Sequence, residues 1–267
     1  MNKNVDIKNI IIDKPLKLDC GQIINNYSLA YETYGSLNEK KDNAILIFHA
    51  LTGDQFVSGI NPITKKEGWW SYAVGSGKAI DTDKYFVICA NVIGGCMGSF
   101  GPSDINPDTN KKYGTTFPVI TINDMVNAQF NLLNFFNIEK LFAVMGGSMG
   151  GMQTLQFVNN FPDKAKVAIP IACTASHSAQ NIAFNELGRQ SIMADANWEN
   201  GDYSNQNKNP NKGLSVARMA AHITYLSKNG LQEKFGRKLQ DSRWLGTLNP
   251  DKNFKVRICK VERDYEF

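Results

Sequence analysis

One stretch, residues 141–162, restricts the fold more than any other part of the chain. An apolar run ends at two glycines, a serine follows, and an amphipathic helical pattern comes next. Residues 146–150 read Gly-Gly-Ser-Met-Gly, which matches the G-x-S-x-G pattern of a serine at a sharp turn between a strand and a helix. Small neighbours are needed because the serine backbone is strained at such a turn. The pattern predicts that Ser148 is a nucleophile, although an ordinary glycine-rich turn or a phosphate-binding loop has a similar composition.

The same turn predicts an oxyanion site. The N–H of Met149 and the helix N-terminus behind it would face an oxyanion formed at Ser148. The apolar run 44–48 predicts a strand buried on both faces, and in folds with this elbow the loop after such a strand supplies a second N–H donor. We assign that donor to Leu51. We expect a structural role for His49 at the strand end, because the catalytic histidine of such folds follows the serine in the sequence.

Alternating strand and helix patterns predict the architecture around this turn. Short alternating segments between residues 5 and 35 predict antiparallel strands that open the sheet. The predicted buried strands are 44–48, 85–91, 140–145 and 167–173. One predicted helix carries Met125, Gln129, Leu132 and Leu133 on its apolar face, and a second spans 151–161 and ends at Pro162. The predicted fold class is α/β, with a mostly parallel sheet flanked by helices over residues 1–175.

The pattern changes after residue 175. Two helical segments, 184–193 and 214–226, flank a polar loop rich in turn residues. They predict a helical cap, inserted after a sheet strand and lying over the site, within a second region of residues 176–267. Arg189 lies on the first of these helices, where it is either a solvated or ion-paired side chain or a planar fork that grips a substrate carboxylate.

Composition excludes several classes of function. The net charge of +4 is mild and spread along the chain, so we expect no nucleic-acid partner. No apolar run reaches the roughly 18 residues of a membrane helix, and the start MNKNVDIKNI lacks an apolar signal region, so we expect a cytoplasmic protein without a membrane partner. The five cysteines are scattered, without C-x-x-C spacing, and predict reduced thiols and no metal site. Nothing near Cys96 would activate it as a nucleophile.

Several longer motifs carry a resemblance to a known family. They are residues 49–54 (HALTGD), 68–70 (GWW), 77–83 (GKAIDTD), 91–96 (NVIGGC), 146–152 (GGSMGGM), 185–190 (NELGRQ) and 217–226 (ARMAAHITYL). Together they resemble the homoserine O-acetyltransferases, acyltransferases of methionine biosynthesis with the α/β-hydrolase fold. The likeness extends from about residue 10 to about residue 245.

The resemblance implies a reaction in which Ser148 takes the acetyl group of acetyl-CoA and passes it to the hydroxyl of L-homoserine. It implies that the N–H groups of Leu51 and Met149 hold the oxyanion and that Arg189 contacts the homoserine carboxylate. Acetyl-CoA is then a co-substrate and no bound cofactor is expected, while the family precedent implies a possible homodimer. The motifs leave open a succinyl-CoA donor, serine as acceptor, and an esterase that uses water.

The sequence departs from the family at its C-terminal end. The family carries the acid and the histidine of its catalytic triad in segments that this sequence does not show, and residues 253–267 no longer resemble it. We therefore expect a C-terminally truncated chain, a fragment or a frame shift near Val256, with an uncovered sheet edge. Asp195 or Asp202 followed by His222 has the order of a replacement triad, but the helical pattern around His222 favours a core or interface role. A catalytically inactive fragment, or a binding module that retains the pocket, is a further alternative.

Overall fold

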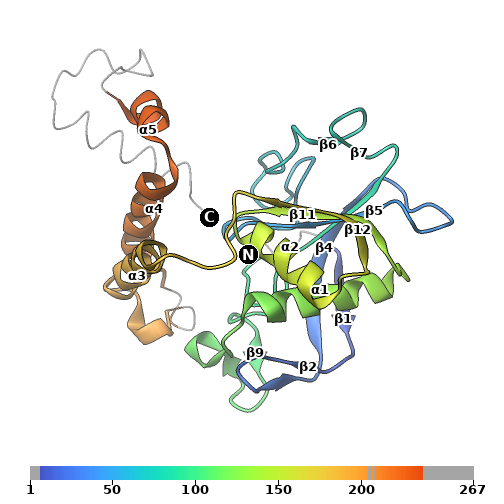
Figure 1. Cartoon of the computed structure of the whole chain (residues 1–267). Coiled ribbons are helices and arrows are strands. Elements are labelled where there is room, and N and C mark those ends of the chain that lie inside the picture. The colour runs from blue at the N-terminus through green and yellow to red at the C-terminus, as the bar shows by residue number, and fades with distance from the viewer. Residues whose placement is uncertain (1–6, 204–205, 207, 237–267) are drawn as a thin grey trace. The chain divides into compact units, whose positions relative to one another are not determined.

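The computed structural model describes residues 7–203, 206 and 208–236. Within these ranges the chain forms two compact units, divided between Ser176 and His177. The first unit is built on a sheet with helices, and the second consists of helices (Figure 1). The C-terminal residues 253–267, and with them the expected frame shift near Val256, lie outside the described residues.

A six-stranded sheet organises the first unit, with strand order β1-β4-β8-β5-β11-β12. Its strands are β1 (Asn9–Ile12), β4 (Tyr27–Tyr34), β5 (Ala44–Phe48), β8 (Phe86–Ala90), β11 (Leu141–Gly147) and β12 (Ala165–Ile171). The last four run parallel, whereas β1 and β4 are antiparallel to their neighbours. Every residue of β5 and β8 is buried, which explains their continuous apolar sequences. The predicted mostly parallel sheet, opened by antiparallel strands, is confirmed.

Three small two-stranded sheets lie in the connections. They are β2 (Leu16–Lys17) with β3 (Ile23–Ile24), β6 (Val74–Gly75) with β7 (Ile80–Asp81), and β9 (Ile105–Asn106) with β10 (Lys111–Lys112). A short 3-10 helix, Gly114–Thr116, follows β10. β2 and β3 thus pair with each other and not with the main sheet, which the sequence pattern did not distinguish.

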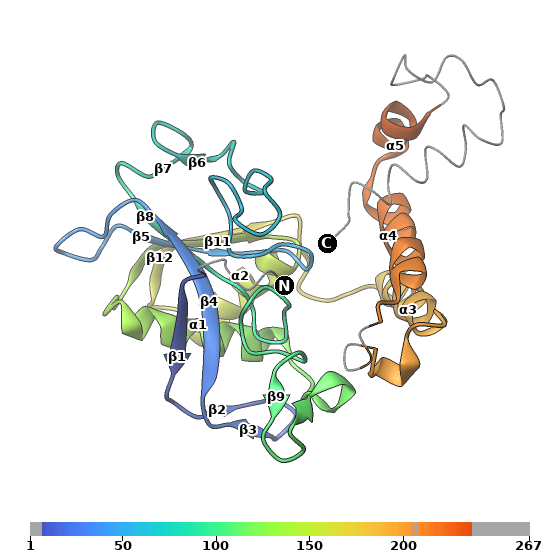
Figure 2. The ribbon, with the colours of Figure 1, turned by 180° about the vertical axis from the view of Figure 1, so that it is seen from behind.

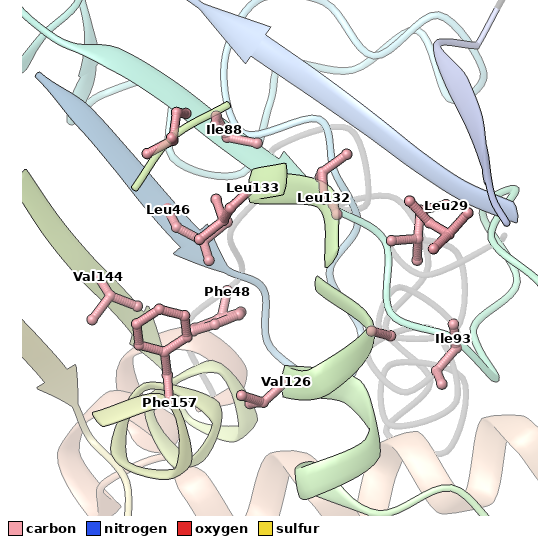
Figure 3. Close-up of a cluster of buried hydrophobic side chains, with 14 of the residues drawn as sticks. Leu29, Leu46, Phe48, Ile88, Ile93, Val126, Leu132, Leu133, Val144 and Phe157 are labelled. Carbon is pink, nitrogen blue, oxygen red and sulfur yellow. The ribbon is translucent and has the colours of Figure 1, made fainter. Parts of the chain in front are cut away.

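Helices α1 (Ile122–Phe135) and α2 (Met149–Asn160) cover one face of the sheet, as Figures 1 and 2 show from opposite sides. Their apolar side chains meet those of the strands in the main core, where Phe157 of α2 and Val126 of α1 lie beside sheet residues such as Phe48 (Figure 3). The predicted face of α1 was correct at three positions, Gln129, Leu132 and Leu133, but Met125 is only half-buried and Val126 takes its place.

The start of α1 is fixed by a capping box. The Thr121 hydroxyl accepts a hydrogen bond from the Asp124 N–H at 3.2 Å, and the Asp124 carboxylate accepts one from the Thr121 N–H at 2.9 Å. The same carboxylate accepts the N–H of Asp19, which ties the helix to the segment after β2. These bonds satisfy N–H groups that have no partner inside the helix.

The opposite face of the sheet is covered without a helix. Residues 49–85 are all described, and they contain turns and the β6–β7 pair, so the predicted alternation of strands and helices fails between β5 and β8. Val57 and Val74 of this segment pack on the strands, and Trp69 and Trp70 stack beside them with ring centroids 5.3 Å apart. This face of the sheet is therefore covered as predicted, but an irregular segment covers it where helices were expected.

β12 forms an exposed edge of the sheet. Among the described strands it pairs only with β11, and Val167, Ile169 and Ile171 are 44%, 41% and 38% exposed. The expected uncovered edge is therefore present. The apolar sequence of β12 is typical of an interior strand, although the strand is not buried here.

The second unit contains α3 (Ala179–Met193), a 3-10 turn at Glu199–Gly201, α4 (Asn211–Tyr225) and α5 (Lys228–Phe235). The helices predicted at 184–193 and 214–226 are confirmed, and each begins earlier than expected. α3 and α4 pack closely enough that a Cβ on Gly213 would lie 2.3 Å from the Ser191 carbonyl oxygen. α5 was not predicted.

Candidate active site

Ser148 occupies the turn between β11 and α2, as the G-x-S-x-G pattern predicts. Its backbone has φ 55° and ψ −121°, a conformation that costs a residue with a side chain about 1–3 kcal/mol. Its N–H donates to the Ile171 carbonyl oxygen at 3.0 Å, which holds the turn against β12. The side chain is exposed. The strand–turn–helix context and the strain are those of a nucleophile elbow, while the nucleophilic role of Ser148 stays a prediction.

Two glycines of the motif are required by close packing. A Cβ on Gly146 would lie 2.5 Å from the Gly150 carbonyl group, and a Cβ on Gly150 would lie 2.1 Å from the Phe48 carbonyl oxygen. The elbow therefore sits directly against the end of β5. Gly147 differs from both, because a Cβ there would have nothing within 4 Å.

The two predicted oxyanion donors come from adjacent parts of this corner. Leu51 lies in the loop after β5 and is 73% exposed, and Met149 is the first residue of α2. The register pairs Gly146 with Phe48, so the ends of β5 and β11 lie side by side. Within the described parts of the chain, no group accepts a hydrogen bond from the backbone N–H of Leu51 or from that of Met149. Both donors are available to a ligand, and their assigned role stays a prediction.

His49 is buried between two loops and both of its ring nitrogens are engaged. Nδ1 lies 2.7 Å from the Ala50 carbonyl oxygen, and Nε2 accepts the Val92 N–H at 3.1 Å. Burial lowers the pKa of His49, which keeps the ring neutral. These contacts support the predicted structural role and argue against His49 as the base for Ser148.

Sequence reasoning missed the buried polar residues that surround His49. The Asn91 side chain contacts Nε2 of His49 at 3.3 Å, and Nε2 of Gln153 reaches the His49 carbonyl oxygen at 3.4 Å. Gln153 also accepts a hydrogen bond from Gln129 on the neighbouring helix. The available signals were weak: a polar residue directly after a buried strand, and glutamines within the apolar faces of two helices.

Ser148 has no base beside it in the described part of the first unit. Its hydroxyl forms no hydrogen bond with a described residue. The chain has three histidines, and only His49 belongs to the first unit. Because both nitrogens of His49 are engaged, the first unit holds the predicted nucleophile and the predicted oxyanion donors but no histidine free to activate the serine.

The proposed replacement triad has other partners in the second unit. The Asp195 carboxylate accepts the N–H groups of Asn197 and Gly213, both at 2.8 Å, and these bonds hold the pKa of Asp195 below its usual value. His222 is buried on α4, and its Nδ1 lies 2.9 Å from the Arg218 carbonyl oxygen one turn earlier. These contacts favour the structural interpretation of both residues.

Arg189 lies on α3 with its guanidinium against the Glu186 carboxylate. Nε donates to that carboxylate at 2.9 Å and Nη2 donates to it as well, while Glu186 also accepts from Gln190. The Arg189 side chain remains 59% exposed. Arg189 is thus ion-paired with Glu186, which was one of the two alternatives. Its contact with a substrate carboxylate stays a prediction.

Other reactive groups are few. Burial raises the pKa of the Cys96 thiol, so the nucleophilic thiolate is disfavoured, as expected. In the described chain, Cys20, Cys89, Cys96 and Cys173 are free thiols.

The described ranges contain no group of three or more histidine, cysteine or acidic side chains placed to hold a metal. They also contain no helix with the length and apolarity that crossing a bilayer requires.

Comparison with known proteins identifies the family. A family model described as alpha/beta hydrolase fold matches residues 43–255 of the 267-residue chain. The chain belongs to the α/β-hydrolase fold family. This membership accounts for the order of the parallel strands and for the serine at the turn after β11.

Similar curated proteins share one name. A homoserine O-acetyltransferase of Pelagibacter ubique is 97% identical over 241 residues, which cover 90% of this chain and 65% of that protein. A homoserine O-acetyltransferase of Mesorhizobium japonicum is 57% identical over 244 residues, covering 91% of this chain and 62% of that protein. The chain therefore spans less than two thirds of the length of these relatives.

Solved structures of two kinds share the fold. The crystal structure of esterase E22 matches with a TM-score of 0.81 at 30% identity, covering 98% of this chain and 74% of that one. A homoserine O-acetyltransferase from Bacillus anthracis matches with a TM-score of 0.84 at 27% identity, covering 98% and 71%. The backbone architecture is thus common to esterases and to homoserine O-acetyltransferases.

Proposed function

We propose that this chain is the nucleophile-bearing part of a homoserine O-acetyltransferase that works through an acetyl-Ser148 intermediate. The observation that carries the proposal is Ser148 itself, an exposed serine held in a strained conformation at the N-terminus of α2. The names of the similar proteins support the choice of acetyl donor and homoserine acceptor. An alignment over 241 of 267 residues has to include the central region around Ser148.

The chemistry has two steps. The Ser148 oxygen attacks the thioester carbonyl of acetyl-CoA, and the N–H groups of Leu51 and Met149 donate to the oxyanion that forms. The C–S bond then breaks, and coenzyme A leaves as a thiol with the proton given up by Ser148. In the second step the homoserine hydroxyl attacks the acetyl ester, and its proton returns to Ser148 as O-acetylhomoserine leaves. Each step moves one proton, so a base is needed beside the serine.

We propose that in the longer relatives this base lies in the part of their sequence that this chain does not match. The resemblance places the acid and the histidine of the triad in segments that this sequence does not show. The described first unit contains Ser148 at its strained turn and the N–H groups of Leu51 and Met149, and its own histidine is engaged elsewhere. Loss of the triad histidine leaves only the part of catalysis due to the oxyanion site and binding. For a chain that holds only these 267 residues, we expect an acylation rate far below that of the longer relatives.

A direct test is the intact mass of the chain after it has been mixed with acetyl-CoA. We expect an acetyl adduct on the wild type and none on Ser148→Ala. The alanine variant is a matched control, because it removes only the hydroxyl and keeps the fold of the turn. Folded protein without any adduct would contradict the proposal for this chain and would favour the inactive-fragment alternative.

Arg189 is proposed to bind the homoserine carboxylate, with Glu186 holding the guanidinium in place. Arg189→Lys keeps the charge but loses the planar fork, so it should raise the homoserine concentration needed for half-maximal transfer by about tenfold. Formation of acetyl-Ser148 should be unchanged. A slower first step would mean that Arg189 acts on the donor or on folding.

A second candidate function is an esterase, in which water replaces homoserine. The match to esterase E22 at 30% identity favours it. The ratio of O-acetylhomoserine to free acetate, measured after acetyl-Ser148 meets homoserine, separates the two functions. The same assay with serine or with succinyl-CoA tests the remaining variants of the proposal. A cytoplasmic location and a homodimer stay predictions.

A further inference from the structure

Leu51, the residue assigned to the oxyanion site, sits on a single tight turn. The Gly53 N–H donates to the Ala50 carbonyl oxygen at 2.9 Å, which makes Leu51 the second residue of a four-residue β-turn. Leu51 is 73% exposed, so its own side chain contributes little to holding this turn. An oxyanion donor works only if it is held in place before the reaction, so another group has to fix the turn.

His49 supplies that fixing contact through one defined tautomer. The Ala50 carbonyl oxygen can only accept a hydrogen bond, so Nδ1 of His49 carries the proton that it receives at 2.7 Å. The Val92 N–H can only donate, so Nε2 of His49 holds the lone pair. The ring is therefore neutral, protonated on Nδ1, and 2% exposed. It bridges the turn that carries Leu51 and the loop that follows β8.

The loop after β8 is rigid enough to serve as an anchor. Asn91 directs its Nδ2 towards Nε2 of His49, and its Oδ1 accepts the Met97 N–H at 3.2 Å, which sets the orientation of the amide. The Met97 carbonyl oxygen accepts Nε2 of Gln55 at 3.0 Å. Asn91 and Gln55 are both buried. The loop is thus tied at both the N–H and the carbonyl of Met97.

The backbone of His49 also contacts the helix that begins at Ser148. A Cβ on Gly150 would lie 3.1 Å from the His49 carbonyl oxygen, and Nε2 of Gln153 reaches the same oxygen at 3.4 Å. His49 therefore contacts three parts of the site: the Leu51 turn, the loop after β8 and the elbow helix.

We propose that His49 is a positioning residue that fixes the Leu51 turn relative to the Ser148 elbow by bridging Ala50 and Val92. The inference rests on the proposed function, because it assigns His49 a task in the acylation of Ser148. His49 does not touch the reacting atoms. Its effect reaches the oxyanion through the peptide backbone of residues 50 and 51.

Three substitutions test this role in the chain as it exists. His49→Leu removes both hydrogen bonds, whereas His49→Gln keeps an acceptor near the position of Nε2. Asn131→Leu is the control for general destabilisation, because Asn131 is buried, bonds to the Tyr27 hydroxyl and lies outside the site. If the leucine variant does not fold, His49→Asn replaces it, since asparagine is too short to reach Val92.

The first readout is the rate at which p-nitrophenyl acetate acylates Ser148, followed by intact mass. We expect His49→Leu to slow acylation by about 100-fold at saturating ester, the order of effect of one lost oxyanion donor, with little change in the half-saturating concentration. His49→Gln should recover to within about tenfold of wild type, and Asn131→Leu should match wild type. Equal rates for His49→Leu and Asn131→Leu would overturn the inference.

The second readout does not depend on activity. Hydrogen exchange at the Val92 amide should accelerate in His49→Leu by at least about tenfold more than the average of the β8 amides, and should stay protected in His49→Gln. Unchanged Val92 exchange in His49→Leu overturns the inference at any level of activity. If the wild type is not acylated at all, the proposed function fails, and exchange alone then decides whether His49 positions the turn.

Discussion

At the scale of single residues, Ser148 shows a conflict between stability and chemistry. Its positive φ is a conformation that glycine adopts freely, yet the position carries a hydroxyl instead. No hydrogen bond of that hydroxyl to a described residue offsets the strain. Strain without structural benefit is typical of functional positions.

Replacement of Ser148 by glycine should therefore stabilise the fold. We expect Ser148→Gly to raise the free energy of unfolding by about 1 kcal/mol, the relief of strain less the added entropy of the unfolded chain. Ser148→Ala keeps the Cβ and should stay within about 0.5 kcal/mol of wild type. Urea unfolding of the three proteins checks this, and equal stability of the glycine and alanine variants would show that the turn is not strained.

His49 predicts a pH dependence of stability. Burial lowers its pKa in the folded state below the ordinary histidine value of about 6.5, so the unfolded chain binds the proton more readily. The contribution of neutral His49 is complete above about pH 6.5 and is lost as the pH falls towards the folded pKa, with a slope of at most about 1.4 kcal/mol per pH unit. Asp54 opposes this at lower pH, because burial raises its pKa.

The measurement is the difference between wild type and His49→Gln in unfolding free energy from pH 7.5 to pH 5. Subtracting one curve from the other cancels the contributions of Asp54 and of the other histidines, because both proteins contain these residues. We expect the wild type to lose stability relative to the variant as the pH falls. Parallel curves would mean that folding does not change the pKa of His49.

At the scale of elements, the contact between α2 and β5 sets the geometry of the site. The glycine at position 150 lets the first turn of the helix rest on the Phe48 carbonyl group. This contact brings the Ser148 turn next to the loop that carries Leu51. The sequence predicted both α2 and β5, but it did not predict how closely they pack.

A pair of alanine substitutions tests that contact. Gly150→Ala places a Cβ 2.1 Å from a backbone oxygen that cannot rotate away, so we expect a loss of at least about 2 kcal/mol in unfolding free energy. Gly147→Ala enters open space and should change stability by less than about 1 kcal/mol. Thermal and urea unfolding measure both. Similar losses for the two variants would contradict the packing described here.

At the scale of the whole molecule, β12 is the strand of the described sheet at which we expect self-association. Its apolar side chains are exposed, and among the described strands only β11 pairs with it. Such an edge can pair with other chains. We expect Ile169→Lys to reduce self-association at high concentration, with a change of less than about 1 kcal/mol in unfolding free energy.

Light scattering as a function of concentration checks this expectation, and Lys166→Ile is the reverse control on the same strand. The lysine variant should scatter less than wild type and the isoleucine variant more. Unchanged scattering in both would show that the β12 edge is not the site of association.

Much of this protein could be derived from its sequence. Continuous apolar runs identified β5, β8 and β11 because both faces of a parallel strand are buried. The spacing of Gly146, Ser148 and Gly150 identified the elbow, because few residue types tolerate that turn. The motifs around them also indicated the family.

Only the tertiary structure decided how these parts meet. Local patterns do not encode which loops a buried side chain bridges. The tautomer of His49 and the anchoring of the Leu51 turn followed from its contact with the adjacent Ala50 together with its contacts to Asn91 and Val92, more than 40 positions away. The absence of a helix between β5 and β8 was equally hidden, and so was the identity of the strand, β12, that forms the expected uncovered edge. An irregular segment and a helix can bury the same sheet face, and an edge strand can have the sequence of an interior one, because burial depends on neighbours that are distant in the sequence.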